Sequence, residues 1–280
     1  MKLLNNIIIF LIRNNPLIPG FLKRRISMHT LIPESVISIK VAGGKTLKMA
    51  HNQWNDVTPA LYWGLGYEDE TAELFFKKCR SASVIIDIGA NVGYYSLLAA
   101  LSNPAAQIFS FEPNPILYER LNENVHLNSM DGRIELYQQA VSSLDGVIPL
   151  YVPKNGVLSE SSTLRGFRND VDAINCDGIC LDNFAKNNQI RKIDLIKMDV
   201  EGAECMVLEG MKNILKDMSP DIICEVLPGR FNAQAEKLLK QYGYQFSWIK
   251  PGKLIPMESA SGDPKYKFKN YFFQARSHVS

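Results

Sequence analysis

A short loop between an apolar strand and a helix limits the folds open to this chain more than any other feature. Residues 84–88 (Val-Ile-Ile-Asp-Ile) have the pattern of a strand buried in a parallel sheet. The loop at residues 87–93 (Asp-Ile-Gly-Ala-Asn-Val-Gly) follows at once and leads into a predicted helix at residues 94–102. Such a loop, between a strand and a helix, is the context that nucleotide binding requires. Gly89 and Gly93 have no Cβ atom, so the backbone can turn tightly and a ligand can approach it.

Strand and helix patterns alternate along the chain after residue 83. We predict further strands at residues 107–111, 134–137, 194–198 and 221–226, and helices at residues 115–128, 203–216 and 231–242. This alternation favours a Rossmann-like α/β fold, in which helices cover both faces of a doubly wound, mostly parallel sheet. Two last strands, at residues 244–249 and 271–275, are predicted to pair as an antiparallel hairpin.

The chain divides into three predicted parts. Residues 1–35 form an apolar and basic leader, residues 36–80 an N-terminal extension of a hairpin and a helix, and residues 81–280 the cofactor-binding domain. A Gly-Gly pair between two alternating runs predicts the hairpin. Within the domain, a long insertion at residues 142–190 contains a polar segment at residues 155–172, which is typical of a functional lid.

The leader allows two interpretations. Residues 3–12 are mostly apolar and lie between Lys2 and Arg13, but a membrane-spanning helix needs about 20 apolar residues. The segment is therefore either a helix on the membrane surface or a helix packed against the protein's own core or a partner. We predict a cytoplasmic protein, with membrane contact through residues 1–25 left open.

Two carboxylates indicate which nucleoside cofactor the loop binds. The dinucleotide fingerprint is absent, because Asn91 stands where its second glycine would be. Asp87 would be unfavourable beside a pyrophosphate, but favourable beside the ammonium and sulfonium of S-adenosylmethionine. Glu112 lies nineteen residues after Gly93, at the end of the neighbouring strand, where a carboxylate can accept hydrogen bonds from ribose hydroxyls. These features together favour S-adenosylmethionine.

Several motifs resemble those of the FkbM family of methyltransferases. The similar runs are residues 83–96, 111–115, 140–142, 181–184 and 193–204, the last reading Ile-Asp-Leu-Ile-Lys-Met-Asp-Val-Glu-Gly-Ala-Glu. The resemblance extends over about residues 64–226. It implies the class I methyltransferase fold, with a seven-stranded sheet whose final strand is antiparallel. It also implies methyl transfer to a hydroxyl of a sugar, a lipid-linked glycan or a secondary metabolite.

The resemblance assigns roles to residues of the cofactor site. Glu112 would bind the ribose, Asn114 would lie near the adenine, and Gln139 and Ala140 would approach the adenine edge. The predicted cofactor-binding residues are Asp87, Gly89, Ala90, Asn91, Gly93, Glu112, Asn114, Gln139 and Ala140.

Three acidic residues after the fourth strand are candidates for catalysis. A hydroxyl acceptor must lose a proton during methylation, so a nearby general base helps. Asp199 lies at the carboxyl end of its strand, where ligands bind in this fold. Glu201 and Glu204 are three residues apart and can share a helix face, although acids in a first helical turn are favourable for structural reasons alone. Glu225 ends the next strand and could face the same cleft.

Charge and cysteine usage argue against other classes. The net charge is +2, and neither a Pro-Pro pair nor a Pro-Cys pair occurs, so we expect no nucleic-acid partner. The five cysteines have irregular spacing, so we predict reduced thiols and no metal site. An NAD-dependent oxidoreductase and a non-catalytic scaffold that binds the cofactor remain the alternatives to a methyltransferase.

Overall fold

The computed structural model describes most of the chain after residue 35. The described residues are 15, 17–19, 36–51, 57–65, 67–154, 158–231 and 233–275. The leader lies almost wholly outside them, so both interpretations of its role stay predictions. In the described ranges, no helix is long and apolar enough to cross a membrane.

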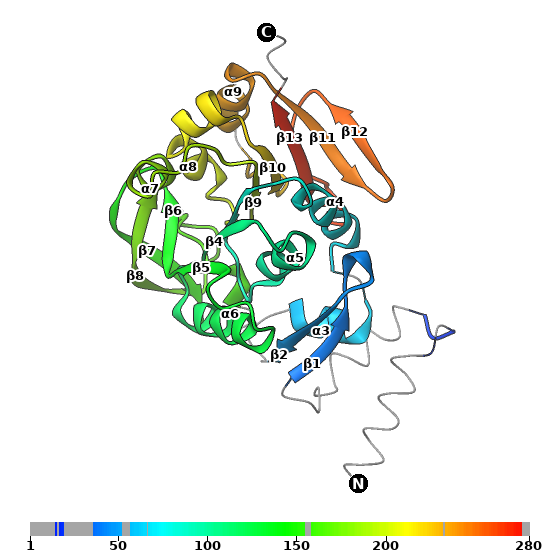
Figure 1. Ribbon diagram of the computed structural model, residues 1–280. Coiled ribbons are helices and arrows are strands. Elements are labelled where there is room, and N and C mark those ends of the chain that lie inside the picture. The colour runs from blue at the N-terminus through cyan, green and yellow to red at the C-terminus, as the bar shows by residue number, and fades with distance from the viewer. Residues whose placement is uncertain are drawn as a thin grey trace.

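The centre of the fold is one sheet of eight strands (Figure 1). Its strands are β3 (Val84–Ile88), β4 (Gln107–Phe111), β5 (Ile134–Tyr137), β9 (Leu195–Met198), β10 (Asp221–Glu225), β11 (Tyr244–Lys250), β12 (Lys253–Met257) and β13 (Asn270–Ala275). Their order is β12-β11-β13-β10-β9-β3-β4-β5, and the five strands from β10 to β5 are parallel. The last strand, β13, runs antiparallel between β10 and β11, as predicted. The eighth strand, β12, was not predicted; it extends the edge of the expected seven-stranded sheet.

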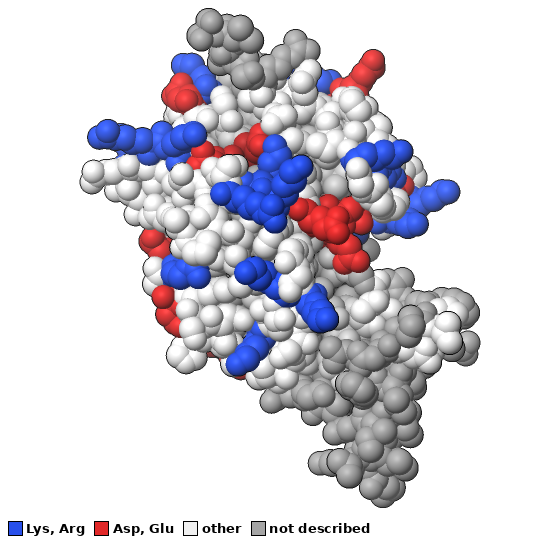
Figure 2. Space-filling model, turned by 45° about the vertical axis from the view of Figure 1, so that its right-hand side comes forward, with Lys and Arg blue, Asp and Glu red and all other residues white. Residues whose placement is uncertain are grey.

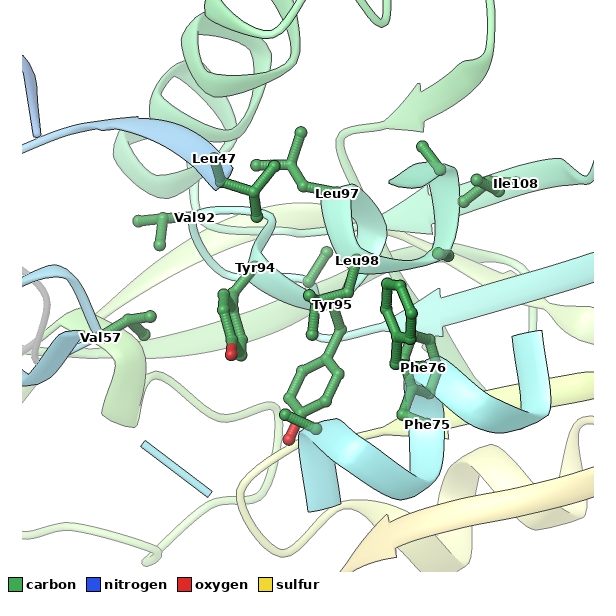
Figure 3. Close-up of a cluster of buried hydrophobic side chains, with 14 of the residues drawn as sticks. Leu47, Val57, Phe75, Phe76, Val92, Tyr94, Tyr95, Leu97, Leu98 and Ile108 are labelled. Atoms are coloured by element: carbon green, nitrogen blue, oxygen red, sulfur yellow. The ribbon is translucent and has the colours of Figure 1, made fainter. Parts of the chain in front are cut away.

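Helices cover both faces of this sheet, as the alternating pattern predicted. One face carries α4 (Asp69–Cys79), α5 (Tyr94–Ser102) and α6 (Pro115–Leu127), and the other carries α7 (Leu181–Asn187), α8 (Glu204–Glu209) and α9 (Ala233–Gln241). Successive strand residues point to opposite faces, so Ile85 packs in the first core and Ile86 in the second. Figure 3 shows Leu97 and Leu98 of α5 within the first core. The helix expected at residues 203–216 is shorter, because α8 ends at Glu209 and a π-helical turn, η3 (Ile214–Met218), follows.

The predicted N-terminal hairpin is confirmed by the antiparallel pairing of two strands. They are β1 (Val36–Lys40) and β2 (Thr46–Ala50), joined by the short helix η1 (Ala42–Gly44) and followed by α3 (Val57–Trp63), which was not predicted. The hairpin buries its alternate side chains in the first core. Asn124 of α6 accepts a hydrogen bond from the Ala50 N–H and donates one to the Val92 carbonyl, both at 2.7 Å. Helix α6 therefore links the hairpin to the predicted cofactor loop.

The insertion forms a second, three-stranded sheet. Its strands are β6 (Gln139–Ser142), β7 (Gly146–Pro153) and β8 (Val171–Cys180), in the order β6-β8-β7. Strand β8 was missed because Asp172, Asn175 and Asp177 interrupt its apolar residues, so no apolar alternation marks it. The short helix η2 (Leu158–Glu160) lies within the segment that was predicted to be a lid.

Candidate active site

A pocket of about 400 Å³ opens at the carboxyl ends of β3, β4, β9 and β10. The parallel strands end at the same edge, so the polar residues that follow them converge there. The pocket also receives residues from the segment before α4, from the insertion and from the start of β13. Nine of the predicted site residues line it: Asp87, Gly89, Ala90, Asn91, Glu112, Gln139, Ala140, Asp199 and Glu201.

The cofactor loop is held against two neighbouring strands. The N–H groups of Gly89 and Ala90 donate to the Phe111 carbonyl at 3.0 and 2.9 Å. Gly89 has a φ of +76°, and a Cβ atom there would lie 1.8 Å from the Asp199 carbonyl oxygen. This position therefore needs glycine both for its backbone conformation and for the close approach of the chain after β9.

The two carboxylates predicted to bind the cofactor are both buried. Glu112 accepts hydrogen bonds from the N–H groups of Asn91 (2.8 Å) and Asn114 (2.9 Å), and Asp87 accepts one from the Ser96 hydroxyl (2.6 Å). Burial raises the pKa of Glu112 to about 7, although these N–H groups oppose the shift. Burial also raises the pKa of Asp87 to about 6, against the Ser96 hydrogen bond and the Lys197 charge.

The pocket walls fit S-adenosylmethionine. Asn91 Oδ1 is buried and lacks a hydrogen-bond partner among the described residues, so it offers an acceptor to a ligand. It lines the pocket together with Asp87 and Glu112, and acceptors of this kind suit an ammonium, a sulfonium and ribose hydroxyls. Gly89 lines the same pocket and has no side chain to fill it.

Three predicted site residues lie outside the pocket lining. Gly93 precedes α5, where a Cβ atom would lie 2.5 Å from Leu121 Cδ1. Asn114 caps α6 by accepting from the Ile116 N–H at 3.0 Å, so it fixes the helix start. Glu204 is buried and accepts from the Gly202 N–H at 3.0 Å, so its position supports the structural alternative rather than a catalytic role.

A group of polar residues, of which Lys197, Glu225 and Asn270 are buried, adjoins Glu201 in the pocket. We call it the polar cluster; its members are Glu68, Lys197, Asp199, Glu225, Lys269 and Asn270, which all line the pocket. Lys197 Nζ lies 3.6 Å from Asp199 Oδ2 and 4.8 Å from the centre of the Tyr95 ring. Burial opposes the charge of Lys197, but the carboxylates of Asp199, Glu68 and Glu225 outweigh it and raise its pKa.

The cluster also ties together distant parts of the chain. Glu68 accepts from the Tyr95 hydroxyl at 2.6 Å and from Asn270 Nδ2 at 2.7 Å. Figure 3 shows the Tyr95 ring within the core, with its hydroxyl directed out of the cluster of apolar side chains. Glu225 Oε1 accepts from Lys269 Nζ at 2.9 Å.

Three carboxylates of the polar cluster resemble a metal-binding set. One oxygen each of Glu68, Asp199 and Glu225 lies within 4.8 Å of the others. Oxygen ligands of this kind suit Mg²⁺ or Ca²⁺. Lys197 already supplies a positive charge to the same carboxylates and would repel a second cation. A site without metal therefore remains our prediction.

Charge on the outer surface is mixed. Figure 2 shows Lys and Arg side chains interspersed with Asp and Glu side chains on the face that it presents.

A second pocket, of about 590 Å³, adjoins the first and shares Glu201 and Lys269 with it. Glu201, one of the three acidic residues predicted to be catalytic, therefore lines both cavities.

The buried carboxyl groups predict an unusual dependence of stability on pH. Burial raises the pKa of Glu112 and of Glu204 to about 7, and that of Asp87 to about 6. The unfolded chain releases these protons near pH 4, so the folded state binds more protons between about pH 4 and pH 7. The free energy of unfolding should therefore fall as pH rises through this range.

Thermal unfolding of the cofactor-free protein should then give a higher Tm at pH 5 than at pH 8. A Glu112→Gln variant should show a weaker fall, because it lacks one titrating group. A Tm that rises steadily from pH 5 to pH 8 would contradict the expectation.

Comparison with known proteins identifies the family. A family model described as the methyltransferase FkbM domain matches residues 87–246, more than half of the chain. Methyltransferase sdnD of Sordaria araneosa is 30% identical, over 58% of this chain and 74% of that protein. Hexuronic acid methyltransferase AglP of Haloferax volcanii is 28% identical, over 62% of this chain and 68% of the AglP chain. The 2-O-methyltransferase NoeI of Sinorhizobium fredii is 34% identical, over 47% of this chain and 58% of the NoeI chain.

The pocket and the family match together define an S-adenosylmethionine-dependent methyltransferase. The chain belongs to the FkbM methyltransferase family. This result confirms the predicted cofactor and enzyme class, and it decides against the oxidoreductase and the non-catalytic scaffold. The roles of individual site residues stay predictions that their positions in the pocket support.

Proposed function

We propose that this enzyme methylates a hydroxyl group of a sugar or of a comparable polyhydroxylated small molecule. The observation that carries the proposal is the Lys197–Asp199 pair, which lies in the pocket next to the cofactor loop. Two relatives are named as a hexuronic acid methyltransferase and a 2-O-methyltransferase, which agrees with an oxygen acceptor on a sugar.

Asp199 is the general base in this proposal. S-adenosylmethionine supplies a methyl group on a positively charged sulfur, so the chain has to align the acceptor and remove its proton. Burial and the Asp199 charge raise the pKa of Glu201 to about 8, so Glu201 keeps its proton at neutral pH and is a poor base. Asp199 lines the pocket and forms an ion pair with the ammonium of Lys197 at 3.6 Å.

In this proposal the insertion serves as a cover for this pair. Ser161, Ser162 and Thr163 line the pocket from the segment predicted to be a lid. The Ser162 hydroxyl donates to the Glu201 carbonyl at 2.8 Å, which fastens the insertion to the loop after β9. Such a cover keeps water away from the reacting groups.

The test is a methylation assay with S-adenosylmethionine that carries a deuterated methyl group. The acceptors are methyl α-L-fucopyranoside, methyl β-D-glucopyranosiduronic acid and trans-1,2-cyclohexanediol, with butylamine and imidazole as nitrogen acceptors. We expect the deuterated methyl on oxygen, found by mass spectrometry and NMR, and none of it with an Asp87→Ala variant. Methylation of the nitrogen acceptors alone, or of none of the compounds, would contradict the proposal.

A further inference from the structure

Three atoms of the polar cluster are buried and lack a hydrogen-bond partner within the described part of the chain. They are Lys197 Nζ, which is a donor, and Glu225 Oε2 and Asn270 Oδ1, which are acceptors. Their residues are 1%, 2% and 3% exposed, respectively. Buried polar atoms are almost always hydrogen-bonded, so three such atoms in one group indicate a ligand or the water that precedes it.

The same three residues line the pocket, and each is held by a second contact. Asn270 donates its amide to Glu68, and Glu225 accepts from Lys269 through its other oxygen. Lys197 is buried beside Asp199 and against the Tyr95 ring. These contacts fix the side chains, so the free donor and acceptors keep a defined arrangement without a ligand.

We infer that the polar cluster is the acceptor subsite and that it selects a vicinal diol, that is, two hydroxyls on adjacent carbons. The reacting hydroxyl oxygen accepts a hydrogen bond from Lys197 Nζ and faces Asp199. The neighbouring hydroxyl binds Glu225 Oε2 and Asn270 Oδ1. The inference rests on the proposed function, because it specifies which hydroxyl compounds that same site takes.

The spacing of the cluster agrees with a ligand of this size. Carboxylate oxygens of Asp199 and Glu225 lie within 4.8 Å of each other, so one small polyol can contact both residues. Burial and the charge of Asp199 raise the pKa of Glu225. The neighbouring hydroxyl has one proton, so it donates to Asn270 Oδ1 and accepts from Oε2 of a protonated Glu225, the form that the raised pKa favours.

Methyl transfer in this subsite combines a proton transfer with a displacement at the methyl carbon. The proton of the reacting hydroxyl passes to Asp199, and an electron pair of the oxygen forms the bond to the methyl carbon. The electron pair of the breaking carbon–sulfur bond remains on sulfur. Lys197 stabilises the negative charge that develops on the oxygen before the new bond is complete.

The test compares each of the three hydroxyl acceptors with a partner that lacks one hydroxyl. The partners are the 3-deoxy forms of the two glycosides, in which no two hydroxyls lie on adjacent carbons, and cyclohexanol for the cyclohexanediol. Sites built to bind a hydroxyl strongly reject analogues without it, so wild-type kcat/KM should be at least about 100-fold higher for a diol than for its deoxy partner. This comparison needs no variant.

Two variants separate the parts of the subsite. Asn270→Leu should reduce the diol preference at least about tenfold, mainly through kcat/KM for the diol, since its hydrogen bond to the second hydroxyl is lost. Lys197→Met should lower kcat for both partners by about 10²- to 10³-fold, because it acts on the reacting oxygen. Both variants should bind S-adenosylhomocysteine as the wild type does.

Two exposed positions provide matched controls for these variants. Asn175→Leu places the same change at an exposed position of β8, and Lys212→Met does so at an exposed position beyond α8. Equal kcat/KM for diols and deoxy partners would overturn the inference while the proposed function stands. An unchanged diol preference in Asn270→Leu would also overturn it. Failure to methylate any of the hydroxyl compounds would count against the proposed function, and the inference would fall with it.

Discussion

An Asp199→Asn variant should lose about 10²- to 10⁴-fold in kcat, the usual contribution of a general base. Asparagine keeps the shape of the side chain but cannot take the proton of the acceptor hydroxyl. Cofactor affinity should be little changed, because the backbone of Asp199 keeps its hydrogen bond to the Ile88 carbonyl, at 2.9 Å. Steady-state kinetics with an acceptor from the panel gives kcat, and calorimetry with S-adenosylhomocysteine gives the affinity.

An exposed aspartate provides the control. Asp217→Asn makes the same change in η3, on the surface, and should leave kcat unchanged. An Asp199→Asn variant with more than about a fifth of wild-type kcat would contradict the assignment, because a lost base has a much larger effect. Glu201 would then be the next residue to substitute.

A Gly89→Ala variant should lose cofactor binding by more than about 100-fold, with a lower Tm. The added Cβ atom would lie 1.8 Å from the Asp199 carbonyl oxygen and 2.8 Å from its carbonyl carbon, so the loop or the chain after β9 must move. The φ of +76° adds strain of about 1–3 kcal/mol for a residue other than glycine. Calorimetric titration with S-adenosylhomocysteine measures the binding, and thermal unfolding measures the stability.

A variant at Gly132 distinguishes backbone strain from the steric collision as the cause of the lost cofactor binding. Its φ is +74°, but a Cβ atom there would have no atom within 4 Å. Gly132→Ala should therefore show the backbone strain without the collision, and it should keep cofactor affinity. Wild-type affinity in Gly89→Ala would show that the close approach to Asp199 does not shape the binding loop.

The cofactor loop was predictable because its signals are local. An apolar strand, two glycines and a helix follow one another within residues 84–102, so no knowledge of distant contacts is needed. Glu112 was found because parallel neighbours β3 and β4 end in register, which brings the carboxylate to the N–H of Asn91. These parts of the site depend only on the strand–helix repeat.

The polar cluster was largely missed because its members come from distant segments. Glu68 and Asn270 are 202 residues apart and form a hydrogen bond at 2.7 Å. An isolated Glu or Asn in a loop or at a strand start gives no sequence signal of such a contact. Lys197 did carry one: a lysine inside an otherwise apolar parallel strand is rarely buried unless it is paired. Glu225 was noted as a possible neighbour of the cleft, and it lines the pocket.

Asn124 of α6 and Asn128, which caps that helix, hold the hairpin through their side-chain amides. Asn128 exchanges two hydrogen bonds with the Lys48 backbone, at 2.9 and 2.7 Å, and Asn124 continues the series to Ala50 and Val92. The match to the family model begins at residue 87, yet these amides join earlier residues to Val92 in the wall of the ligand site. Residues outside the family match therefore support the loop inside it. A fragment that begins at residue 87 would lose the backbone groups of Lys48 and Ala50 to which Asn128 and Asn124 bind.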